Sequence, residues 1–478
     1  MTMTKEIKKQ WLQNYKTAPD QLNKMSKING LISAFNANID AVIKLSGKDI
    51  EKLITDFNID QKEILSENIT TINTKEDVLR GLLKCFTNGI AEEWLIEDVE
   101  IFKWLQKNLG YDKLQMGGQG GIVANVMAVC GVNNVFVHCA SLGEEQANLF
   151  LDLPNLVSVD ENGTVNKAKN IKRTNDIPLI HWIIEFDKGD TVTIDGKEFT
   201  CPKSNRFIAT YDPLNFKLHI DEAFANCLSD ENINYDYIIL SGYQMLQEEL
   251  SDKTLGTDRI EASKKILEKW VNSNKNHVLH LEMASTQDVV IRKNLLDNLA
   301  TKVDSLGFNE RELIDLLEVI GEDDLAKECI ENTNSVNLFR GMEKIFEYTN
   351  CPRLQSHMFG LYVTLQEKSF KVTPKQNLDG MQLAAVIAAA KAGTGAIDDY
   401  ETLLWAKDLE VSDVGLNELQ DLSNLVEANN DTKTLMKTGI VSNNRYDLIA
   451  VPTILIDKPI TLVGMGDTIS SISLVGAR

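Results

Sequence analysis

The sequence predicts an α/β fold: a large domain with a mainly parallel central sheet flanked by helices, and a smaller β-rich lid domain inserted discontinuously. From Tyr235 onward, short apolar strands alternate with helical segments such as Asp258 to Ser273. That alternation is typical of parallel β-α-β units. Residues 150 to 205 differ, because strands and tight turns follow one another there. This stretch is therefore expected to be mostly lid-like β structure.

The composition limits the possible partners and the compartment. A net charge of -21 over 478 residues argues against binding to nucleic acid or to an anionic membrane surface. The seven cysteines show no short paired spacing, so reduced thiols are expected rather than a disulfide framework or a zinc site. The polar N-terminus and the absence of any run of about 18 apolar residues predict a cytoplasmic protein.

The first expected strand, Gly30 to Phe35, runs into the polar sequence NANID at residues 36–40. Side chains two residues apart in a strand point to the same side, so Asn38 and Asp40 can together bind the hydroxyls of one ligand. A surface turn, in which Asn and Asp are common, is the alternative.

Two further segments precede the expected lid strands. The adjacent Glu92 and Glu93 read as a solvated face by default. Residues 116–121 contain four glycines and precede an apolar helix, which suits close approach of backbone to a ligand at a helix N-terminus. The run fits neither a phosphate-binding P-loop nor a dinucleotide fingerprint, and a flexible hinge is the alternative.

A long strand is predicted from Leu179 to Phe186, with His181 inside it. A histidine in such a strand is more often a hydrogen-bonded core residue than a ligand. The one basic concentration of this acidic chain surrounds the strand, and it indicates either an anion pocket or a solvated face. It consists of Lys167, Lys169, Lys172, Arg173, Lys203 and Arg206.

Strands predicted at residues 238–242, 278–282 and 303–306 end in polar or small residues, and ligands gather beyond such ends in parallel sheets. His280 and Glu282 should share one side of their strand. Asn309 and Glu312 have the spacing of a helix capping box. Carboxylates that organise hydrated Mg²⁺ beside a phosphate are the functional alternative.

Near the C-terminus, the apolar runs 454–456 and 460–463 predict a strand that leads into Gly464, Gly466 and a small-residue helix. The N-terminus of that helix offers free N–H groups and the positive end of its dipole, which suits a phosphoryl group. Asp467 stands at this corner, where its carboxylate can take a proton from an attacking hydroxyl. A simple N-cap is the alternative.

Taken in order, these motifs resemble those of the ADP-dependent sugar kinases, the archaeal-type glucokinases and phosphofructokinases of the ribokinase-like superfamily. The motifs are NANID (36–40), MGGQGGI (116–122), IHWIIEF (180–186), NRFI (205–208), LSG (240–242), HLE (280–282), NERE (309–312), and VPT with VGMGDTIS (451–470). The resemblance implies transfer of the β-phosphoryl group of MgADP to a sugar hydroxyl, leaving AMP.

The resemblance also implies roles for individual residues. Asp467 is the expected general base, Gly464 and Gly466 belong to the anion hole, and Arg206 meets the transferred group. The metal is expected at Glu282, Asn309, Glu312 and Asp467, and the nucleotide at His357, Val451, Met465 and Asn309. The expected sugar contacts are Asn38, Asp40, Glu92, Glu93, Gly117, Gly118, Gln119 and His181, with Lys172, Arg173 and Lys203 for a sugar phosphate.

Fructose 6-phosphate is the expected acceptor, and the basic set including Lys172, Arg173 and Lys203 could hold its phosphate. Glucose is expected as a second substrate, because Glu92 and Glu93 occupy the segment that contacts a glucose hydroxyl in the family. The resemblance implies a large domain of residues 1–37, 116–165 and 207–478 and a lid of residues 38–115 and 166–206. A monomer or small homo-oligomer is expected. The alternatives are an ATP-dependent ribokinase-type kinase and a non-catalytic protein that binds sugar or nucleotide.

Overall fold

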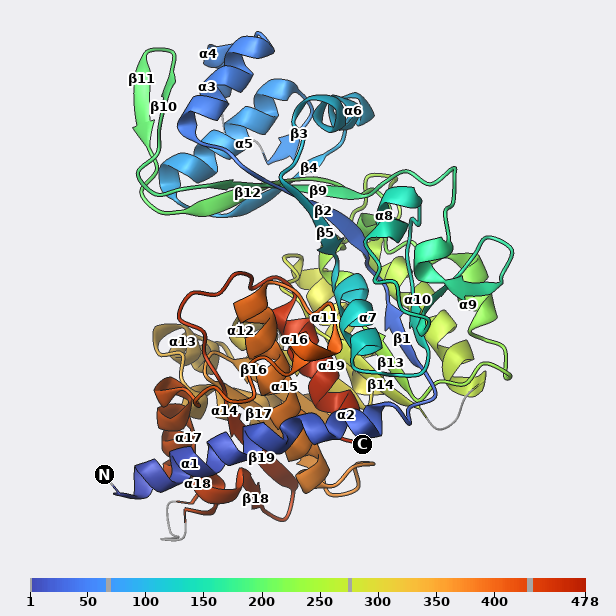
Figure 1. Cartoon of the computed structure of the whole chain (residues 1–478), viewed down its shortest axis with the longest axis vertical. Coiled ribbons are helices and arrows are strands. Elements are labelled where there is room, and N and C mark those ends of the chain that lie inside the picture. Colours follow the sequence, from blue (N-terminus) through green and yellow to red (C-terminus); the bar gives the residue numbers. More distant parts are fainter. Residues whose placement is uncertain (1, 66–69, 274–276, 428–432) are drawn as a thin grey trace.

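The computed structural model describes residues 2–65, 70–273, 277–427 and 433–478, which form two sheets with their helices (Figure 1). The larger sheet confirms the predicted α/β architecture. Its strands, in spatial order, are β18 (Ile440–Ser442), β19 (Tyr446–Pro452), β17 (Leu361–Glu367), β16 (Arg353–Met358), β15 (Ser305–Phe308), β14 (Val278–Glu282), β13 (Tyr237–Leu240), β1 (Leu31–Ala34), β6 (Val135–Val137), β7 (Leu156–Val159) and β8 (Val165–Lys167).

The strands from β16 to β7 in this order pair in parallel, and antiparallel strands complete both edges. The parallel strands are buried on both faces, so they read as continuous apolar runs. Their carboxyl ends, with polar residues such as Glu282, lie at the same edge of the sheet.

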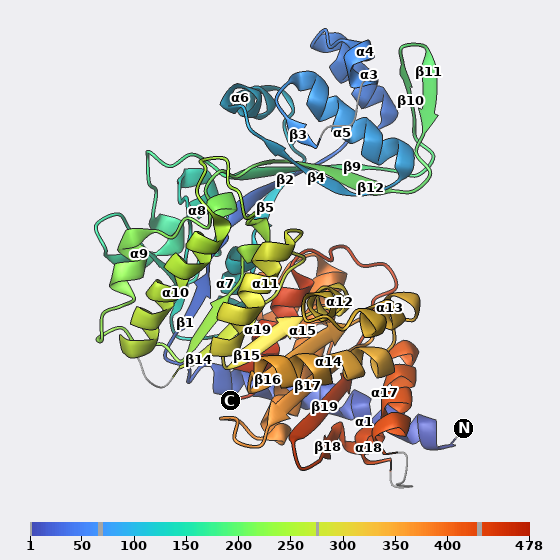
Figure 2. The same cartoon turned by 180° about the vertical axis from the view of Figure 1, so that it is seen from behind.

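Helices cover both faces of this sheet. One face carries α7 (Gln119–Val129), α15 (Pro374–Thr394) and α19 (Met465–Val475), and the opposite face, seen in Figure 2, carries α10 (Gly256–Ser273), α11 (Val289–Asn298), α12 (Glu310–Val319) and α14 (Ser335–Thr349). The remaining helices of this part are α1 (Thr2–Thr17), α2 (Leu22–Met25), α8 (Glu144–Asn148), α9 (Glu222–Cys227), α13 (Asp323–Glu331), α16 (Tyr400–Leu403), α17 (Asp413–Val426) and α18 (Thr434–Thr438).

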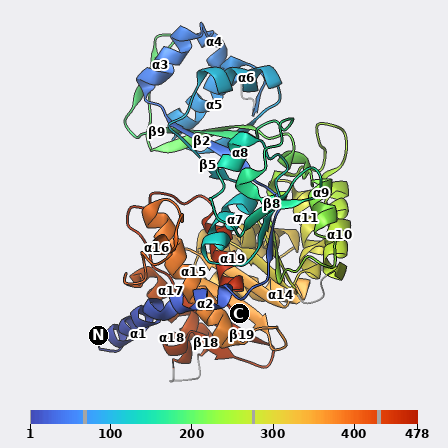
Figure 3. The same ribbon diagram turned by 45° about the vertical axis from the view of Figure 1, so that its right-hand side comes forward.

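The second sheet stands apart from the first (Figure 3). Its order is β3 (Thr71–Ile72), β4 (Glu92–Ile96), β12 (Asn205–Tyr211), β9 (Ile180–Phe186), β2 (Asn38–Lys44) and β5 (Lys113–Gly117), and a hairpin of β10 (Thr191–Ile194) and β11 (Lys197–Thr200) adjoins it. Its helices are α3 (Gly47–Asp56), α4 (Gln61–Ile64), α5 (Lys75–Asn88) and α6 (Val99–Asn108). A separate apolar core lies between these helices and one face of the sheet. We call this unit the lid.

Two sequence-based expectations require correction. Residues 150 to 205 are not all lid, because β7 and β8 pair with the large sheet, and β12 continues its pairing with β9 through Tyr211. The strand expected within residues 454–463 is absent: β19 ends at Pro452 and an irregular segment leads to α19. Since β17 and β18 already occupy both sides of β19, no pairing edge remains there.

Two general expectations can be compared with the structure. All seven cysteines are free, as their spacing predicts. No helix in the described part of the chain combines the length and the apolar character that crossing a bilayer requires.

Candidate active site

A cavity of about 440 Å³ lies between the lid and the large domain. The lid contributes the face of its sheet that the helices leave uncovered, and the large domain contributes the N-terminal ends of α7 and α19. The polar side chains and glycines of its wall include Asn36, Asn38, Asp40, Glu93, Lys113, Gln115, Gly118, Gln119, His181, Glu185, Arg206, Gly464 and Asp467. Most of the predicted sugar contacts therefore share one cavity with the predicted base.

Asp467 lies in the first turn of α19, which begins after Gly464. Gly464 has a φ of +60°, a left-handed conformation that favours glycine, so the tight corner depends on this residue. The Asp467 side chain is buried, and its Oδ1 accepts a hydrogen bond from Nε2 of Gln119 at 2.6 Å. Burial raises the pKa of Asp467 to about 6, although Lys391 and Gln119 act in the opposite direction. The carboxylate is therefore ionised, but still basic, at neutral pH.

Lys391 was not identified from the sequence. It comes from α15, and its Nζ donates to the carbonyl oxygen of Gly464 at 3.0 Å and to Oγ1 of Thr468 at 3.1 Å. Burial lowers the pKa of Lys391 to about 8. This ammonium fixes the corner and offsets the charge of Asp467. The available signal was a lysine within the alanine-rich, buried stretch of this helix.

Asn38 and Asp40 do point to the same side of β2, as their spacing predicts. Nδ2 of Asn38 donates to Oδ1 of Asp40 at 2.8 Å, and both side chains are buried. Gly117 of β5 lies opposite Asn38 in the ladder. A Cβ atom on Gly117 would lie 2.2 Å from Oδ1 of Asp40, so only glycine leaves room for this pair.

His181 is neither a core histidine nor a solvated one. Its Nε2 lies 3.0 Å from Oδ2 of Asp212, and its Nδ1 lies 3.6 Å from Oε1 of Glu93. Burial would lower the pKa of His181, but Asp212, Glu93 and Asp40 together raise it to about 9. The ring is therefore a cation at neutral pH, and carboxylates hold it in the cavity wall.

The two adjacent glutamates of β4 point to opposite faces of the lid sheet. Glu93 lines the cavity, and its Oε1 accepts a hydrogen bond from Thr210 at 2.6 Å. Glu92 instead binds Nζ of Lys84 at 2.8 Å and accepts from Nε1 of Trp94 at 2.8 Å. Glu93 therefore belongs to the cavity wall, whereas Glu92 contributes to the packing of α5 on the sheet.

The predicted phosphate-binding cations do not reach the cavity. Lys172 pairs with Glu144, and the buried Arg173 pairs with Asp221 at 3.0 Å. Lys203 is exposed and is not part of the cavity wall. In this structure, Lys172 and Arg173 form local ion pairs outside the cavity wall, so their role in binding a sugar phosphate remains a prediction.

Two other cations line the cavity: the predicted Arg206 and Lys113, which the sequence reading missed. Among the residues that the structure describes, neither of them forms an ion pair. Lys113 stands at the start of β5, shortly before the glycine run, and its position in an ordinary polar stretch gave no signal.

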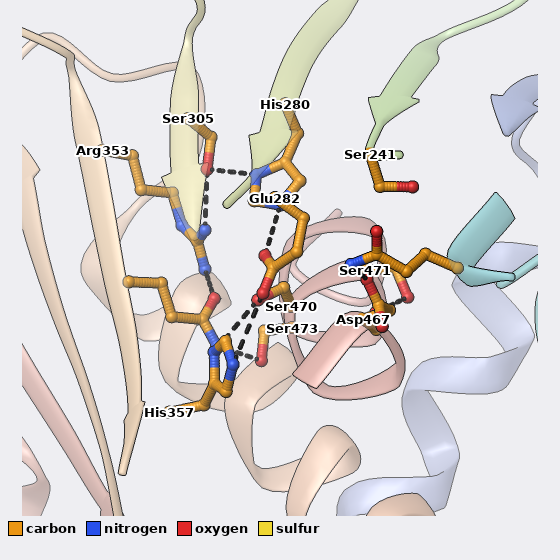
Figure 4. Close-up of polar contacts among 12 residues, drawn as sticks. Ser241, His280, Glu282, Ser305, Arg353, His357, Asp467, Ser470, Ser471 and Ser473 are labelled. Carbon is orange, nitrogen blue, oxygen red and sulfur yellow. Dashed lines mark hydrogen bonds and ion pairs between the residues drawn. The ribbon is translucent and has the colours of Figure 1, made fainter. Parts of the chain in front are cut away.

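A second polar group is formed by side chains of β14, β15 and β16, next to α19 (Figure 4). His280 and Glu282 share one side of β14 as predicted, with Nε2 of His280 3.1 Å from Oε2 of Glu282. His357 of β16 lies on the other side of that carboxyl group, with Nε2 3.4 Å from its Oε1. Ser305 bridges His280 and Arg353 at 2.9 Å on each side. Burial, with Asp467 and Glu312 nearby, raises the pKa of Glu282 well above its usual value.

The motif at Asn309 forms the capping box that its spacing predicts. Oδ1 of Asn309 accepts from the backbone N–H of Glu312 at 3.0 Å, and the Glu312 carboxylate accepts from the backbone N–H of Asn309 at 2.8 Å. The box holds a buried carboxylate, and burial raises the pKa of Glu312 to about 8. Glu282, Glu312 and His357 each offer a ligand atom within 4.8 Å of the others. The motif at Asn309 and Glu312 can therefore cap the helix and also offer a metal ligand.

The expected nucleotide contacts are only partly supported. His357 is buried against Glu282 and Ser470, and burial lowers its pKa to about 4. Val451 is fully buried in β19, so its side chain belongs to the core. Met465 is half-buried at the start of α19 and packs against the same core. Sequence patterns alone do not separate such core neighbours from residues in the cavity wall.

Comparison with known proteins agrees with this site. The family model described as the ADP-specific Phosphofructokinase/Glucokinase conserved region matches residues 29–476. An ADP-dependent glucose/glucosamine kinase from Pyrococcus furiosus is 34% identical, with 98% of each chain covered.

Two solved structures are also similar. The last common ancestor of ADP-dependent phosphofructokinases from Methanosarcinales has a TM-score of 0.86 at 31% identity, covering 99% of this chain and 98% of that one. An ADP-dependent kinase complex with fructose-6-phosphate and ADPβS has a TM-score of 0.80 at 30% identity, covering 98% and 97%. The chain therefore belongs to the family of ADP-specific phosphofructokinases and glucokinases.

Proposed function

We propose that this protein transfers the terminal phosphoryl group of ADP to a sugar hydroxyl and releases AMP. The observation that carries the proposal is the shared cavity. Asp467, at the N-terminus of α19, lines the same space as Asn38, Asp40 and His181 of the lid. A hydroxyl-bearing ligand held by the lid side chains lies within the space that the Asp467 carboxylate also faces.

In this reaction, the proton of the sugar hydroxyl passes to the Asp467 carboxylate while the hydroxyl oxygen forms a bond to the β-phosphorus. The bond from that phosphorus to the bridging oxygen breaks, and AMP leaves. The free N–H groups of the first turn of α19, after Gly464, stabilise the charge on the transferred group. Arg206 of the lid supplies a cation from the opposite wall. Little covalent chemistry is needed from the protein beyond this alignment.

Glu282 and Glu312 fit a magnesium ion, because Mg²⁺ prefers carboxylate oxygens and a few waters. Burial and the nearby Asp467 raise the pKa of both carboxyl groups, so a bound cation would compensate their charge. Asn309 orients Glu312 through the capping box. When bound, Mg²⁺ would neutralise charge on the nucleotide phosphates. His357 is a poorer ligand type for this ion, and we assign it to the orientation of Glu282.

Fructose 6-phosphate is the proposed main acceptor and glucose a second one. Lys113 and Arg206 provide cavity cations for a sugar phosphate, and Glu93 provides a carboxylate for a glucose hydroxyl. The related proteins include both a glucose/glucosamine kinase and a kinase bound to fructose 6-phosphate. We further propose that the enzyme acts in the cytoplasm as a monomer or small homo-oligomer, without nucleic-acid or membrane partners.

Initial rates with each nucleotide and each sugar test the proposal. The purified protein is assayed with MgADP or MgATP, combined in turn with fructose 6-phosphate and glucose, and the products are identified by ³¹P NMR. We expect turnover with ADP and formation of one AMP for each sugar phosphorylated. Turnover with ATP alone would overturn the choice of donor. Binding of both ligands without any turnover would indicate a binding protein instead.

A further inference from the structure

The residue behind His181 is Asp212, which no sequence motif singled out. It directly follows the end of β12 at Tyr211, and its side chain is buried. Its carboxylate accepts hydrogen bonds from three donors. These are Nε2 of His181 at 3.0 Å, the backbone N–H of Asn215 at 3.0 Å and Nδ2 of Asn215 at 2.8 Å.

The contact with Asp212 decides how His181 faces the cavity. Because Nε2 carries the proton shared with Asp212, Nδ1 is the atom left toward the cavity side, where Glu93 lies 3.6 Å away. The charged groups that face the ring are Asp40 on β2, which is its partner in the β2–β9 ladder, Glu93 on β4, and Asp212 after β12. Their combined effect raises the pKa of His181 to about 9, so Nδ1 also carries a proton and acts as a donor.

Asp212 also lies where the chain returns from the lid to the large domain. Asn215, which donates twice to Asp212, donates in addition to the carbonyl oxygen of Ala37 at 3.3 Å. Ala37 lies on the outward crossing of the chain, between β1 and β2. One buried carboxylate therefore connects the histidine of the cavity wall to both of these crossings between the two domains.

We propose that Asp212 is a positioning residue for the acceptor sugar: it holds His181 with Nδ1–H directed toward a sugar hydroxyl and links that contact to the two crossings of the hinge. The inference rests on the proposed function, since it takes the ligand of this cavity to be a sugar. Asp212 itself lies behind the ring and does not line the cavity. Its effect on the sugar is exerted through His181.

The substitution Asp212→Asn tests the proposal through a pH profile. Asparagine keeps the size of the side chain but removes one of the three negative charges that keep the ring protonated, so the pKa of His181 should fall from about 9 toward the ordinary histidine value of about 6.5. We expect kcat/KM for the sugar, expressed as the ratio of variant to wild type, to fall about tenfold between pH 6 and pH 8. Taking this ratio cancels the titration of Asp467, which both proteins share. KM for ADP should be the same in the two proteins.

Asn215→Ala is the matched comparison, because it removes the link to Ala37 and one donor to Asp212 but keeps the charge beside His181. Its ratio to wild type should be independent of pH. A ratio for Asp212→Asn that is equally flat would overturn the proposal, since a purely structural role lowers activity alike at every pH.

A measurement on the wild type covers the case in which Asp212→Asn does not fold. The chain contains six histidines, so their ring ¹⁵N signals can be followed by NMR against pH, with His181 assigned through His181→Gln. We expect both ring nitrogens of His181 to stay protonated through pH 8. A ring that is neutral at pH 7 would overturn the inference. This readout does not depend on turnover, so it remains decisive even if the assays with ADP and sugar disprove the proposed function.

Discussion

The proposed sugar side and the proposed nucleotide side of the site each place a histidine next to carboxyl groups, yet the pKa values of the two histidines are shifted in opposite directions. On the sugar side, Asp212, Glu93 and Asp40 raise the pKa of His181 to about 9. On the nucleotide side, burial lowers the pKa of His357 to about 4, although Glu282 is only 3.4 Å away. The difference lies in the carboxyl groups. Burial, together with the nearby Asp467 and Glu312, raises the pKa of Glu282 well above its usual value, so Glu282 does not provide a full negative charge.

The charges on the sugar side therefore compensate one another within the protein, whereas those on the nucleotide side do not. The lid sheet brings its own cation, His181, to its carboxylates, so the sugar contacts are held in place before ligand binds. The carboxyl end of β14 and the start of α12 bring Glu282 and Glu312 together, and within the described part of the chain no lysine or arginine forms an ion pair with either of them. We propose that a cation arriving with the nucleotide balances the charge on that side.

The largest effect that would distinguish the two sides is on stability. His181→Gln leaves the buried Asp212 without its charged partner, and we expect a loss of about 3 kcal/mol in the free energy of unfolding near pH 6. Because the pKa of His181 is raised in the folded state, this contribution is complete below about pH 6.5 and disappears as the pH rises through about 9.

Chemical denaturation at several pH values measures this effect. The difference between wild type and His181→Gln should shrink from pH 6 to pH 9. His219→Gln, at an exposed histidine, serves as the control and should show no difference. A loss of stability that does not change with pH would mean that His181 is not charged in the folded protein.

On the nucleotide side, Glu282→Gln should act on metal binding and not on stability. We expect the Mg²⁺ concentration for half-maximal rate to rise about 10- to 100-fold, because a carboxylate ligand is replaced by an amide. The melting temperature should not fall, since a costly buried carboxyl group has been removed. The measurement is an activity titration with Mg²⁺ together with a thermal melt.

Glu318→Gln, at a half-exposed carboxylate of α12, is the control for that experiment. It should leave the Mg²⁺ requirement unchanged. If Glu282→Gln has no more effect than Glu318→Gln, then Glu282 is not a metal ligand and the imbalance on this side needs another explanation.

The smallest predicted effect separates the two glutamates of β4. Glu93→Gln should raise KM for glucose about tenfold, because a hydrogen bond to a charged group is weakened. Glu92→Gln should leave KM unchanged and cost less than about 1 kcal/mol of stability, since Lys84 and Glu92 form a partly exposed pair. Steady-state kinetics with glucose decide the matter, and equal changes in KM for both variants would contradict the assignment of opposite faces.

The sequence predicted side-chain relations that depend on the geometry of one element. His280 with Glu282, Asn38 with Asp40, and the Asn309 box all follow from spacing within a strand or a helix turn. The order of strands and helices was likewise sufficient for the architecture of the large sheet. Such patterns are local, and the chain itself determines them.

Relations between distant segments could not be predicted in this way. Arg173 pairs with Asp221, and Lys172 pairs with Glu144. Nothing in the local basic pattern indicates these ion pairs. The apolar run near Ile460 reads as a strand. Its backbone N–H instead binds the carbonyl oxygen of Ala392, because β19 has no edge left to pair. Lys113 and Lys391 were missed for the same reason.

Single-turnover kinetics of Asp467→Asn test the central claim most directly, namely that the corner before α19 carries the base for phosphoryl transfer. Enzyme in excess is mixed with MgADP and fructose 6-phosphate or glucose, and AMP formation is followed, with binding of both ligands measured separately. The account predicts a rate lowered about 10²- to 10⁴-fold with both ligands still bound. An unchanged rate of AMP formation would show that Asp467 is not the base.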